Sequence, residues 1–558
     1  MPTFTPPAPG QGKPDGPWWK TATGYQIYPR SFADSNGDGI GDIPGIISRL
    51  DHLAGLGIGF IWLSPVYASP MADNGYDIAD YRAIAPEFGT LDDFDTLVAE
   101  ARRRGIGIVM DLVVNHSSDE HAWFEAARSD PHAPEHDYYV WRDPSPDGGP
   151  PSDLMACFGG PAWTYVPEIG KYYLSYFSAK QADLNWQNPR LRAEIYDMMN
   201  WWFDRGIAGF RMDVISLIGK DVDAGIFEEG PYLHEFLQEM HRETLAGREV
   251  MTIGESWSVS LETALLYCGH ERGELDMVFQ FNHVTQGWDE TYGKFKPKPF
   301  DLVRLKKVLN DWQAGLGDDG WNSLFLSNHD LPRHVSIYGD DGSHRVASAK
   351  TIATILHLMK GTPFVYQGEE IGMTNVRFTS IEQFRDLETL GHHAAQMAQG
   401  VDEAAFLEGA NRNGRDNSRT PMQWDDGPRA GFTTGEPWID VNANKDRINV
   451  AADGADPDGI MAHYRALIAA RRDLPVVVDG RHAPFAEDDP AIFAYRRELD
   501  GRRLSVVANF GGEPATFDVP DGLTVRGRCL VHTHEPRAEV AGRMTLAPWE
   551  SVAVIDAE

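Results

Sequence analysis

The sequence contains little cysteine, which limits how the protein can be stabilised. Its 558 residues include three cysteines, Cys157, Cys268 and Cys529, that lie far apart along the chain. So few thiols at such spacings do not form the dense disulfide framework of small secreted domains. We therefore expect the fold to depend on a hydrophobic core, for which 42% hydrophobic residues and 16 tryptophans provide ample material.

Long apolar runs are also lacking. No stretch approaches the roughly 20 residues of a membrane-spanning helix, so we expect no part of the chain to be embedded in a membrane. The first residues, MPTFTPPAPGQGKPDG, contain no apolar segment of the kind found in a signal peptide. We expect a cytoplasmic protein, and we interpret residues 1–17 as a flexible tail because they are rich in proline and glycine.

Basic residues are scarce relative to acidic ones. The chain has 50 Lys and Arg against 83 Asp and Glu, a formal net charge of −33. Such a surface repels nucleic acid and anionic lipid, so neither a nucleic acid nor a membrane is an expected partner. The simplest interpretation of the acidity is solubility.

Short apolar runs are present, and they alternate with helical patterns. LDDFDTLVAEARRRG and NPRLRAEIYDMMNWWFDRG repeat apolar residues at intervals of three and four, and each ends in glycine. Apolar strands alternating with such helices indicate a parallel sheet covered by helices, and eight units predict a (β/α)₈ TIM barrel. A doubly wound open sheet is the alternative, but no glycine-rich phosphate turn follows the first run. The eight runs are TGYQIYPRSF, GIGFIWLSPVY, GIGIVMDLVVNH, GIAGFRMDV, VMTIGESW, MVFQFNH, SLFLSNHD and TPFVYQGEE.

Two regions depart from this alternation. A stretch rich in proline, glycine, aspartate and aromatics follows DLVVNH, and a structureless loop of that length would be unusual, so we predict a small inserted domain over residues 117–186. After about residue 475, short alternating strands such as RLSVVANF predict a C-terminal antiparallel β-sandwich domain over residues 476–558. The barrel would then occupy residues 18–116 and 187–475.

Charged side chains gather where the apolar runs end. A single aspartate at a strand end is commonly a helix cap or an ion-pair partner. In a barrel, however, the C-terminal ends of all the strands meet at one mouth, and several acids there indicate a functional site. The residues concerned are Asp111, His116, Arg211, Asp213, Glu255, His329 and Asp330.

Glycoside hydrolysis is the chemistry that requires paired carboxylates. One ionised acid attacks the sugar carbon, and one protonated acid gives its proton to the leaving oxygen. Arg211 stands two residues before Asp213, on the same face of its strand, and is placed to keep Asp213 ionised. Glu255 lies near other acids, so we expect its pKa to rise, as a proton donor requires.

Four motifs in this order, DLVVNH, GFRMDV, GESW and SNHD, resemble the signature regions of the α-amylase superfamily of glycoside hydrolases. NGYDIADY, KQADLNW and GRDNSRTPMQWDD resemble its oligo-1,6-glucosidase and α-glucosidase branch. The resemblance implies that Asp213 is the nucleophile, Glu255 the general acid/base, and Asp330 a third catalytic acid that grips sugar hydroxyls. It also implies that Asp77 and Arg415 form a pair closing the sugar pocket. The implied substrate-binding residues are Tyr76, Asp77, His116, Phe177, Gln181, Arg211, Val214, His329 and Arg415.

The implied activity is that of an exo-acting, retaining α-glucosidase on a small oligosaccharide or disaccharide. Enzymes of this branch that prefer α-1,6 bonds resemble this chain in having valine at position 214, where maltose-preferring enzymes tend to have threonine. A transglucosylase, or a sucrose- or maltose-active α-glucosidase, is the alternative on the same scaffold. A sucrose isomerase is less favoured, because GKFKPKPFDLVRLKKVLNDW lacks the RLDRD-like stretch of those enzymes. A non-catalytic transporter subunit is disfavoured because all three acids are present.

The stretch DSNGDGIGD suggests a metal site. Asp34, Asn36, Asp38, the carbonyl of Ile40 and Asp42 offer oxygen ligands at near-alternate positions, which suit Ca²⁺ or Mg²⁺. An ordinary EF-hand is excluded because its twelfth position, a glutamate, is glycine here. A similar stretch in the resembled branch looks like a structural calcium loop, whereas the alternative is an Asx-rich turn without metal. Catalysis needs no metal and we expect no organic cofactor; we expect a monomer or a weak homo-oligomer.

Overall fold

The computed structural model describes residues 16–557, so nearly all of the predicted tail over residues 1–17 lies outside the described residues. Eight parallel strands form one sheet in the order β13-β12-β11-β5-β2-β1-β15-β14. An isolated parallel bridge between Val278 and Asn322 links its two edges, so the sheet forms a nearly closed barrel. The predicted TIM barrel is therefore confirmed, and each of the eight apolar runs supplies one strand. The strands are β1 (Gly24–Ile27), β2 (Phe60–Leu63), β5 (Gly107–Leu112), β11 (Gly209–Met212), β12 (Met251–Glu255), β13 (Met277–Phe279), β14 (Ser323–Leu324) and β15 (Thr362–Tyr366).

Alternate residues of each strand pack on opposite sides of the barrel wall. In β2, Phe60 and Trp62 belong to the cluster that fills the barrel interior, whereas Ile61 and Leu63 pack outward against the helices. Gly24 of β1 makes room for this filling, because a Cβ atom there would lie 2.4 Å from the ring of Phe60. Because both faces of the strands are buried, the strand sequences are continuous apolar runs and do not alternate with polar residues.

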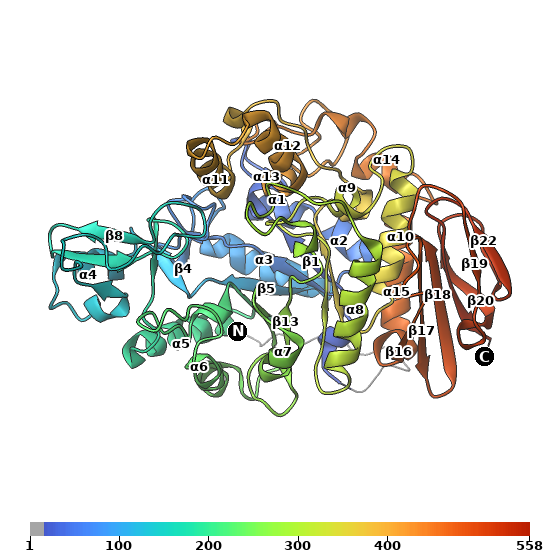
Figure 1. Ribbon diagram of the computed structural model, residues 1–558, viewed down its shortest axis with the longest axis horizontal. Coiled ribbons are helices and arrows are strands. Elements are labelled where there is room, and N and C mark those ends of the chain that lie inside the picture. The colour runs from blue at the N-terminus through green and yellow to red at the C-terminus, as the bar shows by residue number, and fades with distance from the viewer. Residues whose placement is uncertain (1–15, 558) are drawn as a thin grey trace.

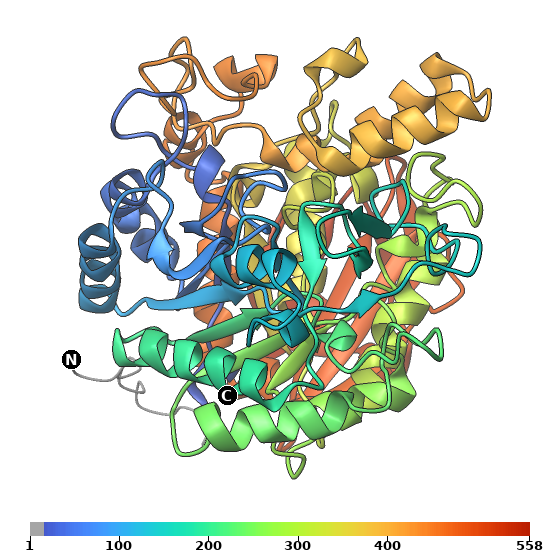
Figure 2. The ribbon, with the colours of Figure 1, turned by 90° about the vertical axis from the view of Figure 1, so that its left-hand side faces the viewer.

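Helices surround the barrel (Figures 1 and 2). The two helices predicted from periodicity are α3 and α5: Thr90 caps α3 and Asn188 caps α5, and Gly105 and Gly206 follow their ends with positive φ. The helices before and around the strands are α1 (Ile43–Ser48), α2 (Leu50–Leu56), α3 (Leu91–Arg103), α5 (Pro189–Asp204), α6 (Leu233–Met240), α7 (Leu261–Cys268), α8 (Leu302–Leu316), α9 (His334–Tyr338), α10 (Arg345–His357), α15 (Ile460–Asp473) and α16 (Pro475–Val478). Between β15 and α15 lie α11 (Leu387–Ala398), α12 (Glu403–Asn413), α13 (Asp416–Arg419) and α14 (Val450–Gly454).

Small antiparallel sheets interrupt the barrel pattern near its second and third strands. In Figure 1 the insertion that follows β5 lies on the opposite side of the barrel from the C-terminal sheets. Its strand β9 pairs with both β7 and β8, and β6 pairs with β10. This confirms a small inserted domain after the third barrel strand. Its elements are β6 (His116–Ser118), α4 (Ala122–Ser129), β7 (Trp141–Arg142), β8 (Trp163–Val166), β9 (Lys171–Leu174) and β10 (Gln181–Asp183); β3 (Tyr67–Ala68) and β4 (Asp80–Ile84) form a separate pair.

The C-terminal region is an antiparallel β domain, as predicted. A six-stranded sheet and a two-stranded sheet share one apolar cluster, in which Val507 and Val552 of the larger sheet meet Phe517 and Leu546 of the smaller. None of the helices between residues 16 and 557 combines the length and apolar character that crossing a bilayer requires. The strands are β16 (Arg481–Phe485), β17 (Ile492–Leu499), β18 (Arg502–Asn509), β19 (Ala515–Asp518), β20 (Val525–His532), β21 (Glu539–Val540), β22 (Arg543–Leu546) and β23 (Ser551–Asp556).

Candidate active site

A buried arginine connects three of the acids at the strand ends. Arg211 of β11 pairs through Nη1 with Asp111 and with Asp213, each at 2.9 Å, and through Nη2 with Glu255. The register of the sheet explains this, because Arg211 lies beside Asp111 of β5 and Ile253 of β12. A single guanidinium therefore holds the carboxylates of Asp213 and Glu255 close together at the mouth of the barrel.

The backbone after Asp213 turns sharply. Val214 has φ +35° and ψ 44°, in the left-handed region that β-branched residues rarely adopt. Its N–H donates a hydrogen bond of 3.3 Å to Oε2 of Glu255, and the Trp257 indole donates one of 2.7 Å to Oε1. Both oxygens of Glu255 are thus oriented. Backbone strain of this kind concentrates at functional sites.

The two facing carboxyl groups have raised pKa values. Burial and the neighbouring carboxylate of Glu255 raise the pKa of Asp213 well above its ordinary value, although Arg211 opposes them. Burial also raises the pKa of Glu255, against the opposing charge of Arg211. The expected rise for Glu255 is present. Arg211 favours the ionised form of Asp213, as expected, but burial and Glu255 outweigh it, so the net shift of the Asp213 pKa is upward. Because the two carboxyl groups are coupled, their protons leave in two steps that belong to the pair and not to either residue alone.

Asp330 belongs to a second charged group. Its carboxylate contacts His329 at 3.1 Å, Arg415 at 3.1 Å and Arg419 at 3.2 Å. Burial by itself would raise the pKa of Asp330, but these neighbours hold it well below the ordinary range. Burial lowers the pKa of His329 to about 3, so its ring is neutral near pH 7. Asp330 is therefore an ionised hydrogen-bond acceptor, whereas the pKa values of Asp213 and Glu255 are raised.

Tyr76 and two polar side chains occupy the floor between these groups. The ring of Tyr76 stacks on that of His329 with centroids 5.1 Å apart, and its hydroxyl donates to Asp111 at 2.9 Å. His116 lies 3.0 Å from the Tyr76 carbonyl and 3.2 Å from Gln181 of the inserted domain. Burial lowers the pKa of His116 to about 4, so this ring is also neutral near pH 7. The floor offers an aromatic face and uncharged hydrogen-bonding groups, which suit a sugar ring.

One predicted pairing is wrong. Arg415 forms an ion pair with Asp73, at 3.3 Å, in addition to its contacts with Asp330, Asp386 and Glu388, and it forms none with Asp77. The Asp77 carboxylate instead accepts hydrogen bonds from the amides of Ala72 and Asp73, at 2.8 and 2.9 Å. Asp77 is buried and stabilises the turn that carries Asp73. The predicted ion pair with Arg415 is therefore made by Asp73, and Asp77 has a structural role beside it.

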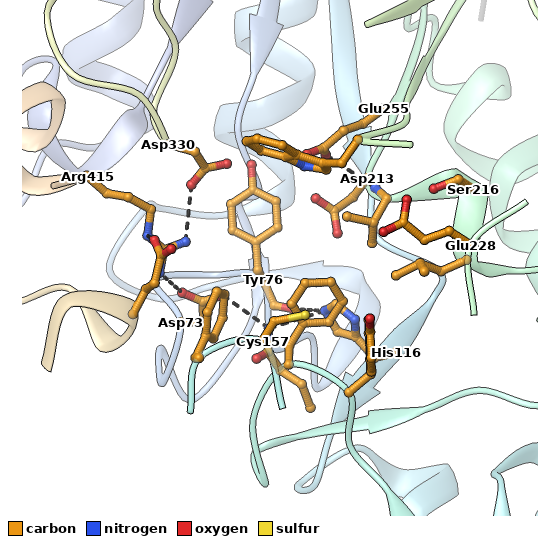
Figure 3. Close-up of a pocket in the computed structure, with 18 of the residues that line it drawn as sticks. Asp73, Tyr76, His116, Cys157, Asp213, Ser216, Glu228, Glu255, Asp330 and Arg415 are labelled. Carbon is orange, nitrogen blue, oxygen red and sulfur yellow. Dashed lines mark hydrogen bonds and ion pairs between the residues drawn. The ribbon is translucent and has the colours of Figure 1, made fainter. Parts of the chain in front are cut away.

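The site residues surround a cavity of about 310 Å³ (Figure 3). Of the sequence-predicted site residues, Asp77, Asp111 and Arg211 are not among the residues that line the cavity. The others are among the lining residues: Tyr76, His116, Phe177, Gln181, Asp213, Val214, Glu255, His329, Asp330 and Arg415. Sequence reasoning missed a further set that comes from the inserted domain, from loops, from the short 3-10 helix after β11 and from the first turn of α11. These are Asp73, Cys157, Phe158, Tyr176, Ser216, Leu217, Glu228, Trp257, Trp288, Lys294 and Glu388.

The acidic loop after β1 lies apart from this cavity, since none of its residues is among the lining residues. Asp34 accepts hydrogen bonds from the amides of Asn36, Gly37 and Gly39, and Asn36 and Asp38 each accept one from the amide two residues later. Asp42 caps α1 through the amide of Gly45, at 2.6 Å. Within residues 16–557, no three His, Cys, Asp or Glu side chains converge as a metal-binding group. A metal here would therefore draw on Asn36 and carbonyl oxygen as well as on carboxylates.

Comparison with known proteins assigns the two main parts of the chain. Residues 26–480 match the model of the alpha amylase catalytic domain, and residues 492–553 match that of the alpha-amylase SusG C-terminal domain.

Full-length relatives agree with this assignment. The palatinase of Erwinia rhapontici is 51% identical over 543 residues, covering 97% of this chain and 98% of that protein. The oligo-1,6-glucosidase of Halalkalibacterium halodurans is 54% identical over 519 residues, covering 90% and 92%. Among solved structures, the trehalose-6-phosphate hydrolase of Bacillus licheniformis superposes with a TM-score of 0.92 at 43% identity, covering 97% of this chain and all of that one. The chain belongs to the α-amylase family and is a glycoside hydrolase of the α-glucosidase and oligo-1,6-glucosidase type.

Proposed function

We propose that the protein is an exo-acting, retaining α-glucosidase that releases glucose from the non-reducing end of short α-1,6-linked glucosides. One observation carries the proposal: Asp213 and Glu255, joined through Arg211, face a cavity that Asp73, Arg415 and Asp330 line on one side (Figure 3). Arg415 contacts both Asp73 and Asp330, so this side is bound together by ion pairs. A cavity closed there admits the end of a sugar chain, which favours release of one terminal unit.

The proposed mechanism has two steps. Asp213 attacks the anomeric carbon and forms a covalent glucosyl-enzyme, while Glu255 gives its proton to the glycosidic oxygen and the leaving sugar departs. Water then loses a proton to Glu255 and attacks the same carbon, which frees Asp213 and yields glucose with its α configuration retained. The hydrogen bonds that Val214 and Trp257 donate to Glu255 would orient its carboxyl group for these steps. Asp330 would accept hydrogen bonds from the hydroxyls of the bound glucose.

The preference for α-1,6 bonds is supported by Val214 and by the relatives. Val214 lines the cavity next to Asp213 and offers no side-chain hydrogen bond to the leaving ring. Relatives at 48–54% identity carry the name oligo-1,6-glucosidase, and one at 49% is named glucan 1,6-alpha-glucosidase. Valine and threonine have nearly the same size, so the hydroxyl is the feature that would distinguish the two linkages.

The linkage is tested by kcat/KM for isomaltose and maltose, with NMR to identify the first anomer released. We expect isomaltose to be preferred and α-glucose to appear first. Val214→Thr should move the ratio toward maltose by ~10-fold, about one hydrogen bond. Threonine is also β-branched, so it places the same strain on the left-handed backbone.

The same experiment has two outcomes that contradict the proposal. A parent enzyme that prefers maltose, or a ratio that does not move in Val214→Thr, would overturn the linkage argument. β-Glucose as the first product would overturn the retaining mechanism.

A sugar-transferring enzyme is the second candidate. The structure of a Klebsiella isomaltulose synthase superposes with a TM-score of 0.94 at 39% identity, covering 97% of this chain and all of that one. Such an enzyme would form the same intermediate on Asp213 and would pass glucose to a sugar in place of water. Chromatography of the products from sucrose distinguishes the two: an isomeric disaccharide would support transfer, whereas free glucose and fructose support hydrolysis.

We further propose that the loop after β1 holds a structural calcium-type ion through Asp34, Asn36, Asp38, the Ile40 carbonyl and Asp42. The donor set fits the chemistry of a hard cation, because it consists of carboxylate, amide and carbonyl oxygens at near-alternate positions. Asp34 already contacts the segment that follows α13: its backbone N–H donates a hydrogen bond to the Phe432 carbonyl, and its carboxylate accepts one from the Thr433 hydroxyl. Bound calcium would fix the loop against this segment.

Calcium removal should lower thermal stability without lowering intrinsic turnover. Binding only to the folded state stabilises by about 2.7 kcal/mol at a hundredfold excess over Kd, which corresponds to a Tm shift of roughly a few degrees. Differential scanning calorimetry with chelator, and after calcium is restored, measures this shift. Asp38→Asn should reduce it, while Asp92→Asn on the exposed first turn of α3 serves as the control. A Tm indifferent to both chelator and calcium would leave the Asx-rich turn as the correct interpretation.

A further inference from the structure

Glu228 is a cavity residue that the mechanism above does not use. It lies in the loop between the 3-10 helix η4 (Ile215–Leu217) and α6, and it lines the cavity together with Ser216. Figure 3 places Glu228 and Ser216 on the opposite side of Asp213 from Asp73 and Arg415. The glucose that is attacked would occupy the side of Asp73 and Arg415, so Glu228 borders the space left for the departing group.

The carboxylate of Glu228 is incompletely paired. Its Oε2 atom is buried and has no hydrogen-bond partner among the residues that the structure describes. Its neighbour Glu229 differs, since that carboxylate accepts hydrogen bonds from Thr263 at 3.0 Å and from Tyr267 at 3.1 Å. Oε1 of Glu229 is therefore satisfied by the protein, whereas Oε2 of Glu228 keeps the capacity to accept a hydrogen bond.

An unpaired buried oxygen costs free energy, and a ligand that supplies a donor removes this cost. Glu228 lines the cavity and the terminal torsion of a glutamate is broad, so a partial turn brings the unpaired oxygen toward a group bound there. A carboxylate only accepts hydrogen bonds, so its natural partner in a sugar-binding cavity is a hydroxyl group. Ser216 beside it can both donate and accept.

We propose that Glu228 accepts a hydrogen bond from a hydroxyl group of the leaving sugar and thereby makes the enzyme select hydroxylated leaving groups. The inference rests on the proposed function, because it takes Asp213 and Glu255 as the pair between which the bond breaks. It adds a specificity-determining residue on the side where the leaving group is released, contributed by a loop of irregular structure. Hydrogen bonds to charged groups are stronger than those between neutral groups, so one such contact is sufficient to influence substrate choice.

The test compares two substrates that differ in the leaving group. One is whichever of isomaltose, maltose or sucrose the parent enzyme cleaves fastest; the other is p-nitrophenyl α-glucoside, whose leaving group carries no sugar hydroxyl. Glu228→Ala should lower kcat/KM for the disaccharide by about 10-fold and change that for the nitrophenyl substrate by less than about 2-fold. Glu228→Gln retains an acceptor oxygen and should recover part of the loss.

Glu229→Gln is the matched control, because it changes the adjacent carboxylate, whose Oε1 already accepts two hydrogen bonds from the protein. It should affect the two substrates equally. Equal losses on both substrates in Glu228→Ala, or a selective loss in Glu229→Gln, would overturn the proposal. Because the disaccharide is chosen by the parent's own preference, an error in the α-1,6 assignment leaves this result interpretable.

Discussion

Replacing Asp213 with asparagine should lower kcat/KM for isomaltose by on the order of 10²-fold or more, because the amide cannot form the covalent glucosyl-enzyme. The loss should be similar for p-nitrophenyl α-glucoside, since every substrate needs the same nucleophile. Steady-state kinetics on both substrates measure it. Near-normal turnover on either one would mean that the nucleophile is misassigned.

Folding provides the control for this variant. Burial and Glu255 raise the pKa of Asp213, so an ionised Asp213 destabilises the folded protein as pH rises above the pKa of the unfolded chain. A neutral asparagine of the same shape removes this charge and can still accept from Arg211. We therefore expect the Tm of Asp213→Asn at neutral pH to equal or exceed that of the parent. A large fall in Tm would attribute the lost activity to misfolding.

Glu255→Gln should separate the two substrates that Asp213→Asn does not. Glutamine cannot protonate the glycosidic oxygen, so kcat/KM for isomaltose should fall by about 10²–10⁴-fold, the usual contribution of general acid catalysis. The p-nitrophenolate ion leaves readily without a proton, so its kcat/KM should fall much less. Equal losses on both substrates would show that Glu255 is not the proton donor.

The pH profile gives a second measurement for the same variant. Burial raises the pKa of Glu255, so this group stays protonated to a higher pH than a free glutamate. Activity of the parent should fall as pH rises through that raised pKa, when the proton donor is lost. Glu255→Gln should lack this alkaline limb. A limb that persists unchanged in the variant would assign it to another group.

Sequence alone predicted the barrel and the carboxylates that lie together at its mouth. The eight strands were predictable because each is buried on both faces and therefore reads as an apolar run bounded by turns. Asp213 and Glu255 were predictable because each lies at the end of such a run, and the C-terminal ends of barrel strands meet at one mouth. The predicted positions of the inserted domain and of the C-terminal β domain also followed from the loss of the helix–strand alternation.

Only the tertiary structure decided which loop residues complete the cavity. Asp73, not Asp77, meets Arg415, because backbone amides already hold the Asp77 carboxylate. Arg419 contacts Asp330 from α13, 89 residues further along the chain. Glu228 and Lys294 enter the cavity from segments without strand or helix periodicity. The periodicity of a sequence indicates which face of a helix or strand is buried. The direction of a loop side chain instead depends on contacts between segments that are distant in the sequence, so no local sequence pattern predicts it.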